Sequence, residues 1–509
     1  DYSNLIGIEA NFFKTGNLFE LDTRFNYSIN YQIEPTNREK VNLSLGIVRG
    51  NTFFANISVS SNLNKLPIPK YIAPPERLKS PYLEPFEELS VDWQKYLSEL
   101  IMWQMGNEGI VTNRVIFNKN ELQAEISQGR FQRPIQAIDL ASRILANNSP
   151  KNITDITVIN LDQGLETFRS TIKRNELVDI IAKRPLDEVD VLFTTKESIL
   201  DESIIVNNEY LYPNLYWNLK PKLGGTIQHQ QKFFFYQLEA LFHATYSINR
   251  SLLISTDIGI NVDNNFEEYT YHIPDGDLHH VRQDRRLYLT EGLSGIRRLV
   301  VDYTKDLTPN IKARLTGGYY ESMFGGIGGE ILYMPDSKSW GLSLDSYWLK
   351  QRDFNQKFGF QNYETISGFL NLFYDLPFYD TRLKISAGKF LGKDKGAHIE
   401  LSRRFETGAR IGGSVSLTDC DAGCVGEGSF NKWIFFELPM DLFYTKSTVR
   451  HKTGYSWSPL TKDAGTKVNN GDLFSLMTNA KDEIETYQKR PWSLKKILSG
   501  FSVSAPNNN

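Results

Sequence analysis

The sequence predicts a mainly β protein, in which strands of transmembrane antiparallel β-barrels flank a small inserted α/β module. Three observations favour this fold class. Aromatic residues make up 13% of the 509 residues, which is ordinary for a barrel with aromatic girdles and high for a soluble α/β protein. Long segments alternate apolar and polar residues with the period of two that a β-strand requires. No run of about 18 apolar residues occurs, so a transmembrane helix is excluded, whereas alternating strands are compatible with the mean hydropathy of −0.38.

Residues 1–70 are expected to form strands of an N-terminal barrel. Segment 21–33 (LDTRFNYSINYQI) alternates throughout and is longer than the roughly 9–11 residues that a tilted strand needs to cross a bilayer. Segments 41–48 and 52–60 follow the same rule, with Phe54 as an exception. About four strands are too few to close a barrel. We therefore expect that the N-terminus has been cut away; the alternative is that these strands join the other barrel.

Residues 71–207 have a different character and predict a proline-rich linker followed by an α/β module. Helical spacing marks 93–105 and 134–146, and each of these segments precedes two short strands. This order indicates a helix-strand-strand unit used twice, with a period of about 40 residues. Segment 175–182 could begin a third helix. A small amphipathic module should lie outside the bilayer, and the periplasm is the natural place because bacterial barrels begin and end there.

Residues 208–460 predict a second, C-terminal barrel. In 310–320 the residues Ile311, Ala313 and Leu315 point away from Lys312 and Arg314. Segments 381–390, 398–405 and 409–418 alternate in the same way. A soluble β-sandwich would also alternate, but its strands are usually shorter and its polar faces carry fewer Arg, Lys, Glu and Tyr. After residue 460 the alternation is lost, so 461–509 is expected to be a C-terminal tail with helical character, folded back as a periplasmic tail or a plug.

Several function classes find little support in the composition. A net charge of −3 provides no basic field for nucleic acid. The seven His residues lack metal-ligand spacing, and we expect neither a metal nor a cofactor. Cys420 and Cys424 could close a small disulfide in an oxidising compartment or remain free thiols. The N-terminus shows no signal peptide, so a leader has been removed or the chain is a fragment.

Longer motifs in the second half carry a resemblance to a known family. They are LTGGYYESMFGGIGGEILYMPDSKSWGLSLDSYWLKQRDFNQKFGFQNYETISGFLNLFYDLPF (315–378), KISAGKFLGKDKGAHIELSRRFETGARIGGSVSLTD (384–419) and VGEGSFNKWIFFELPMDLF (425–443), with INVDNNFEEY (260–269) and VRQDRRLYLTE (281–291) fitting the same pattern. The chain resembles the YjbH family of outer-membrane exopolysaccharide and capsule proteins along most of its length. One departure is SPLTKDAG (458–465), which is a diverged form of the family's Pro-Leu-Thr-Arg-Asp-Gly-Gly segment.

The resemblance implies a bacterial outer-membrane protein with two barrel regions joined by periplasmic α/β structure. It implies a role in the export or surface assembly of an exopolysaccharide, with a polysaccharide-export lipoprotein as a periplasmic partner and outer-membrane lipids around the barrel. A hydrated lumen would bind the polymer weakly, through aromatic rings and charged groups. Candidates for lumen groups come from the family-like segments: Glu321, Glu330, Tyr333, Arg352, Asp353, Tyr363, Glu364, Glu400, Arg403 and Arg404.

Two other functions remain open at this stage. The protein could anchor capsule at the surface without transporting it. It could also trim the polymer, because Glu321 and Glu330 flank a glycine-rich turn and paired carboxylates perform glycoside hydrolysis. We expect no enzyme activity, since the separation of these two carboxylates is unknown and no other catalytic spacing is found.

Overall fold

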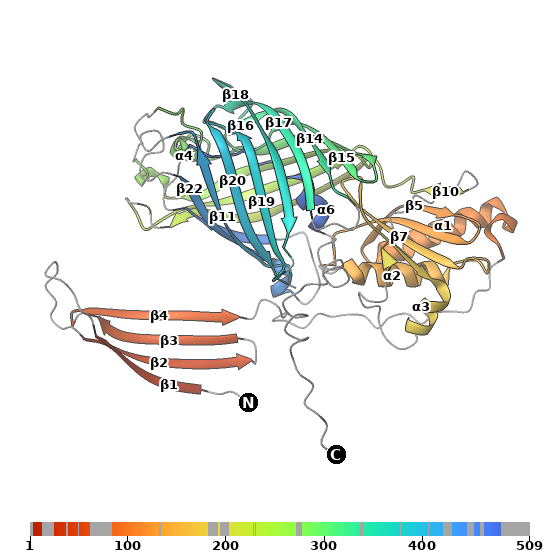
Figure 1. The fold of residues 1–509 in the computed structure, drawn as a ribbon, viewed down its shortest axis with the longest axis horizontal. Coiled ribbons are helices and arrows are strands. Elements are labelled where there is room, and N and C mark those ends of the chain that lie inside the picture. The colour runs from red at the N-terminus through yellow and green to blue at the C-terminus, as the bar shows by residue number, and fades with distance from the viewer. Residues whose placement is uncertain are drawn as a thin grey trace, which may run out of the picture.

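The chain was analysed as a computed structural model (Figure 1). The structure describes residues 4–12, 25–36, 39–48, 50–61, 84–131, 134–181, 192–193, 203–227, 229, 231–270, 277–335, 340–376, 378–405, 407–420, 430–444, 452–458 and 463–479. The strands form three sheets of four, six and thirteen strands. Among the described residues, no helix combines the length and the apolar character needed to span a membrane.

The first sheet is a four-stranded antiparallel meander. It contains β1 (Asn4–Phe12), β2 (Phe25–Thr36), β3 (Glu39–Val48) and β4 (Thr52–Ser61). The register places Ile29 opposite Leu45, and Ile47 opposite both Tyr27 and Phe53. All five of these side chains are exposed on one apolar face of the sheet. The predicted alternation of 21–33 is therefore present in β2 from residue 25 onward, and 21–24 lie outside the described residues.

The second sheet belongs to the α/β module and has the order β10-β5-β6-β7-β8-β9. Only β6 and β7 are parallel within it, because α2 connects them as a crossover. The module's elements are η1 (Phe86–Glu88), α1 (Val91–Asn107), β5 (Ile110–Phe117), β6 (Glu121–Gln128), α2 (Pro134–Asn147), β7 (Asp155–Asp162), β8 (Leu165–Lys173), α3 (Arg174–Ile181), β9 (Leu192–Phe193) and β10 (Ile204–Asn207).

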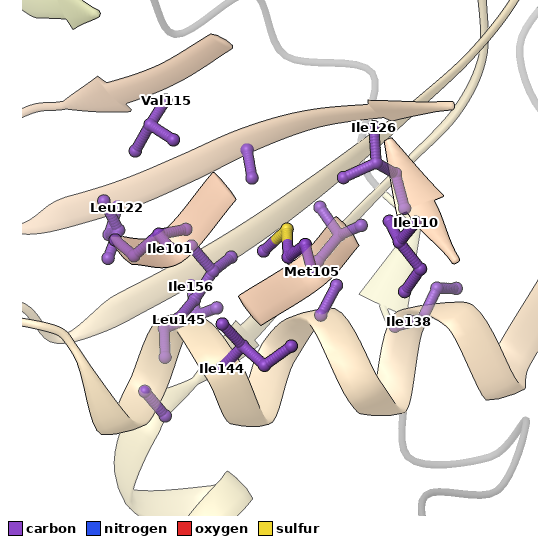
Figure 2. Packing of buried hydrophobic residues seen from close by; sticks show 14 of the residues in the cluster. Ile101, Met105, Ile110, Val115, Leu122, Ile126, Ile138, Ile144, Leu145 and Ile156 are labelled. Carbon is purple, nitrogen blue, oxygen red and sulfur yellow. The ribbon is translucent and has the colours of Figure 1, made fainter. Parts of the chain in front are cut away.

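Both long helices of the module pack on the six-stranded sheet through one apolar core. Figure 2 shows Ile101 of α1 and Leu145 of α2 grouped with Ile156 of β7, and Ile138 of α2 near Ile110 of β5, within one buried cluster. The N-terminus of α1 is capped by Ser90, whose hydroxyl accepts a hydrogen bond from the Trp93 backbone N–H at 3.4 Å. The module thus has a core of its own.

The third sheet has thirteen antiparallel strands in strict sequence order, so each strand pairs with the next one through a hairpin or a longer loop. Its strands are β11 (Asn214–Ile227), β12 (Phe234–Ser247), β13 (Leu252–Asn264), β14 (Gly295–Thr308), β15 (Ile311–Tyr319), β16 (Phe324–Tyr333), β17 (Trp340–Arg352), β18 (Phe360–Asp375), β19 (Thr381–Lys389), β20 (Lys395–Arg404), β21 (Arg410–Thr418), β22 (Asn431–Pro439) and β23 (Lys452–Trp457). The other helices among the described residues are η3 (Phe266–Glu268), α4 (Arg285–Thr290), η4 (Met440–Phe443) and α6 (Leu473–Asn479).

The prediction of a mainly β protein with a small α/β module is confirmed. The third sheet curls strongly in Figure 1. Within the described strands, no pairing joins β11 to β23, the two ends of the sheet order. A closed barrel therefore stays a prediction.

The two faces of the thirteen-stranded sheet are inverted relative to a sheet in a soluble protein. On β15 the charged Lys312 and Arg314 are buried, whereas Leu315 between Arg314 and Thr316 is 64% exposed. On β17 and β18 the exposed positions include Leu344, Trp348, Ile366 and Leu370. We call the face with the buried polar groups the inner face and the other the outer face.

The two ends of this sheet also differ. At one end, which we call the module end, the turns 248–251 and 309–310 are short, and the β7–β8 hairpin of the module docks there. The Glu166 backbone N–H donates to Asp306 at 3.1 Å, and Thr304 donates to the Gln163 carbonyl. At the other end, the loop end, the long connection 265–294 contains α4. Short turns on the periplasmic side and long loops outside are the arrangement of bacterial outer-membrane barrels.

Candidate functional site

The inner face of the thirteen-stranded sheet is occupied by a segment of the chain itself, residues 463–479, which we call the strap. The strap begins at the loop end, where Asp463 accepts hydrogen bonds from the backbone N–H groups of Val281 and Arg282 at 2.8 and 2.7 Å. The Gly465 backbone N–H donates to Asp394 in the β19–β20 turn at the same end. The first part of the strap is therefore fixed by loops.

In its middle part the strap is held by basic side chains from several strands. Arg314 of β15 donates to the carbonyls of Asn470 and Gly471 at 3.2 and 2.9 Å, and Arg298 of β14 donates to the Asn470 side chain at 3.2 Å. Lys384 of β19 forms an ion pair with Asp472 at 2.7 Å. Most of these contacts reach main-chain or short polar acceptors, so they bind an extended, acceptor-rich chain.

At the module end the strap becomes α6 and enters an apolar cluster. Phe474 stacks on Phe373 of β18 with ring centroids 4.4 Å apart, and both rings are almost fully buried. The cluster also contains Leu332 of β16 and Leu165 of the module. The strap thus runs from the loop end to the module end and touches the docked module.

The contacts of the strap require the sheet to be strongly curved. Its partners come from β14, β15, β16, β18, β19, β21 and β22, which follow one another across the sheet. The strap runs along the strands from the loop end to the module end, whereas β14 and β22 would lie about 38 Å apart in a flat sheet at about 4.8 Å per strand, too far for both to contact it. The sheet must therefore bend around the strap, as the curl in Figure 1 shows.

The ten candidate residues do not form one site. Four of them contact the strap, the inner face or its ends: Glu321 and Glu330 bind the strap backbone, Tyr363 donates to the Leu391 carbonyl at 2.6 Å, and Glu400 pairs with Arg410. Asp353 lies in the β17–β18 turn, where its backbone N–H donates to the Gly359 carbonyl. Arg404 ends β20, and its backbone N–H donates to the Asp380 carbonyl.

Three candidates lie on the outer face and are corrections to the expected lumen set. Tyr333 is 41% exposed and meets Trp340 edge to face, and Arg403 stacks over the rings of Tyr379 and Phe405. Glu364 is exposed on β18 between inward-facing neighbours. Side chains alternate between the two faces of a strand. Each of these three residues is an odd number of positions from an inward-facing candidate on its strand, so it points to the opposite, outer face.

Arg352, a candidate lumen group, is bound by the loops of the sheet. It is fully buried and donates to the carbonyls of Glu321, Gln356 and Lys357 at 2.8, 3.1 and 3.1 Å. A guanidinium with this many backbone partners ties the β17–β18 turn to the β15–β16 turn. Its role in the structure is to fix the loop end.

The two carboxylates considered for glycoside hydrolysis are each engaged by the chain. Glu321 pairs with Arg282 at 2.8 Å and Glu330 with Arg314 at 3.1 Å. In addition, Glu321 accepts from the Asn469 backbone N–H and Glu330 from that of Leu473. The strap therefore covers both groups.

Sequence reasoning missed the groups that do most to hold the strap, namely Lys384, Asp472 and Lys467. Lys467 lies 4.0 Å from the centroid of the Phe369 ring and donates to Asn371 at 3.2 Å. The alternation of 381–390 places Lys384 on the polar side, but nothing in the local pattern indicates its partner 88 positions away.

The described residues contain no group of three His, Cys, Asp or Glu side chains placed to hold a metal ion. Cys420 is disulfide-bonded. Its predicted partner, Cys424, lies outside the described residues.

The fold and its inner face define a class: a protein built on a long, strongly curved antiparallel sheet with an apolar outer face and a polar interior filled by its own chain. Comparison with known proteins gives the family. A family model described as exopolysaccharide biosynthesis protein YbjH matches residues 9–479, and the chain belongs to this YjbH family. The chain is 26% identical over 470 residues to the uncharacterized lipoprotein YjbH of Escherichia coli (strain K12), covering 91% of this chain and 66% of that protein. The chain thus matches a little under two thirds of that relative's length.

Proposed function

We propose that the chain is an outer-membrane protein whose thirteen-stranded sheet closes into a transmembrane β-barrel, and that it takes part in the export or surface assembly of an exopolysaccharide or capsule. The observation that carries the membrane part is the inverted sheet. Aliphatic and aromatic side chains such as Leu315, Ile327 and Ile366 are exposed on the outer face, while Arg314 and Glu330 are buried on the inner face. Lipid would cover the outer face, and closure would satisfy the sheet edges at β11 and β23.

The polysaccharide part of the proposal rests on the family. Its description names exopolysaccharide biosynthesis, and a relative carries the name lipoprotein, which supports a location in the cell envelope. The inner face supports it in chemical terms, because its arginines and rings suit hydroxyl and carboxylate acceptors and the faces of sugar rings. A non-catalytic role is proposed, since Glu321 and Glu330 are both engaged in ion pairs and covered by the strap.

We assign the module to the periplasm and propose that it binds a polysaccharide-export lipoprotein. The β7–β8 hairpin docks at the end of the sheet with the short turns, which is the periplasmic end of an outer-membrane barrel. Helix α1 exposes Trp93, Tyr96 and Trp103 away from the module core, and exposed aromatic residues are enriched at protein interfaces. A photo-crosslinking residue at Trp103 should capture the partner in cells, whereas the same residue at Val111 on β5 should not.

The experiment that tests the function is a measurement of exopolysaccharide in a strain that lacks the protein, made separately in the medium, on the cell surface and in the periplasm. Polymer trapped in the periplasm is the result expected for an export role. Normal release with lost surface retention would indicate surface assembly instead. Unchanged polymer in all three fractions would refute the proposed function.

A further inference from the structure

The strap fills the space that a polymer would need on the inner face. Its middle part lies among donors from three strands and one loop: Arg298, Arg314 and Lys384 of the sheet and Arg282 of the 265–294 connection all point at acceptors of residues 467–472. Acceptors bound in this way are the Lys467 carbonyl at 2.9 Å, two further carbonyls, an amide oxygen and a carboxylate. Three of these five acceptors are main-chain carbonyls, and the other two are the side chains of Asn470 and Asp472.

The wall beside the strap also offers ring faces. Phe373 is covered by the ring of Phe474, and Phe369 lies 4.0 Å beneath the ammonium group of Lys467. Buried polar atoms at the same contact, the Arg314 Nε, Thr316 Oγ1 and Glu330 Oε1 atoms, have no hydrogen-bond partner in the part of the chain that the structure describes. Donors, ring faces and unfilled polar positions along one track are the groups that recognise a polysaccharide.

We propose that the strap is a displaceable plug that occupies a polysaccharide-binding track on the inner face, and that a polymer rich in hydroxyl and carboxylate acceptors takes its place. This inference rests on the proposed function, because it names the binding track of the same site. Displacement frees Arg298, Arg314 and Lys384 together with the face of Phe373. It leaves in place the wall pairs Arg314–Glu330 and Arg298–Asp302, whereas Lys384 loses the Asp472 carboxylate and becomes available to a carboxylate of the polymer.

The geometry provides a way to loosen the plug without changing the strap itself. A Cβ atom on Gly341 of β17 would lie 2.6 Å from the Phe474 ring, so Gly341→Val must push α6 from its seat. Gly224 of β11 has no atom within 4 Å of such a Cβ, so Gly224→Val is the matched control. Asp472→Asn is a second variant that loosens the strap, because it removes the charge that pairs with Lys384. The asparagine side chain can still accept the hydrogen bond from the Ser475 backbone N–H, so the cap of α6 is kept.

The experiment measures the conductance of the full chain in planar bilayers of phosphatidylethanolamine and phosphatidylglycerol. Wild type and Gly224→Val are expected to conduct rarely. Gly341→Val and Asp472→Asn should each raise the open fraction about tenfold or more, since a loss of 1.4 kcal/mol in plug binding is tenfold. Oligogalacturonate or dextran oligomers, added to an opened variant, should block the current, and Arg314→Gln in that background should weaken the block.

Two results would overturn the inference. One is equal conductance of all four proteins, with the variants shown to be folded by their electrophoretic mobility without heating. The other is an opened variant whose current neither oligosaccharide blocks. The bilayer experiment does not measure secretion, so it tests the plug independently of the proposed function. A failure of the proposed function would instead appear as normal amounts of polymer in the deletion strain.

Discussion

Replacing Leu315 with Arg tests whether the outer face of the thirteen-stranded sheet lies in lipid. Leu315 stands at the centre of β15, is 64% exposed, and pairs across the sheet with Tyr303 and Gly329. In a membrane, a guanidinium at this depth costs about 2–4 kcal/mol, which lowers the folding equilibrium constant roughly thirty- to several-hundred-fold. In water, the same change at an exposed position costs within about 0.5 kcal/mol.

The assay is the folding of urea-unfolded protein into lipid vesicles, followed through the electrophoretic mobility of unheated samples across a urea series. Val91→Arg is the matched control, because Val91 lies on α1 of the module and is 78% exposed. The control should fold like the wild type. If Leu315→Arg shifts the urea midpoint no more than Val91→Arg does, the outer face is not in lipid and the membrane proposal is wrong.

Three further predictions concern the strap and the module. Phe474→Ala removes a buried ring that stacks on Phe373, so it should weaken the seat of α6 by about 3–5 kcal/mol and raise hydrogen exchange in 473–479 while the strands stay protected. Gly164→Val places a side chain against the Arg250 carbonyl, at a position whose φ of +81° favours glycine, so the β7–β8 hairpin should leave its docked position. The measurement is a chemical crosslink between the module and the 248–251 turn, which this variant should lose. Burial raises the pKa of Asp162 to about 6, so the folded state holds its proton more tightly. The contribution of Asp162 to module stability should be fully present below about pH 4 and be lost as pH rises through 6, and thermal unfolding of Asp162→Asn should lack this part of the pH dependence.

The strands could be predicted because their signal is local. Alternation within 310–320 locates β15 (Ile311–Tyr319) and assigns Lys312 and Leu315 to opposite faces, as the structure has them. Helical spacing likewise locates α2 (Pro134–Asn147) from the predicted 134–146. Both patterns follow from the geometry of one element and need no knowledge of its neighbours.

The candidate site was predicted less well, and part of the reason was visible in the sequence. Tyr363 and Glu364 are adjacent, as are Arg403 and Arg404, and residues next to each other in a strand point to opposite faces. No such pair could lie entirely on the inner face. Selecting residues by parity along each strand would have removed Glu364 and Arg403 from the set.

The strap could not be placed from the sequence for a different reason. The loss of alternation after residue 460 indicates an element other than a wall strand, but the contact of Asp472 with Lys384 spans 88 positions. Such a contact depends on how far the sheet curls, which is a property of all its strands together. Local patterns therefore establish that 463–479 differs from the strands without establishing what it touches.

The two ends of the strap are held by different forces, and this determines how it could leave. At the loop end the buried Asp463 carboxylate accepts three backbone hydrogen bonds, from Val281, Arg282 and Gln283, so this end is held by polar contacts. At the module end the seat of Phe474 includes Leu165, which begins β8 directly after the docked hairpin. Apolar burial there cannot be replaced by water without cost. Pulling the hairpin away would remove Leu165 from the cluster and weaken the apolar end, so binding of the proposed partner to the module would favour release of the strap.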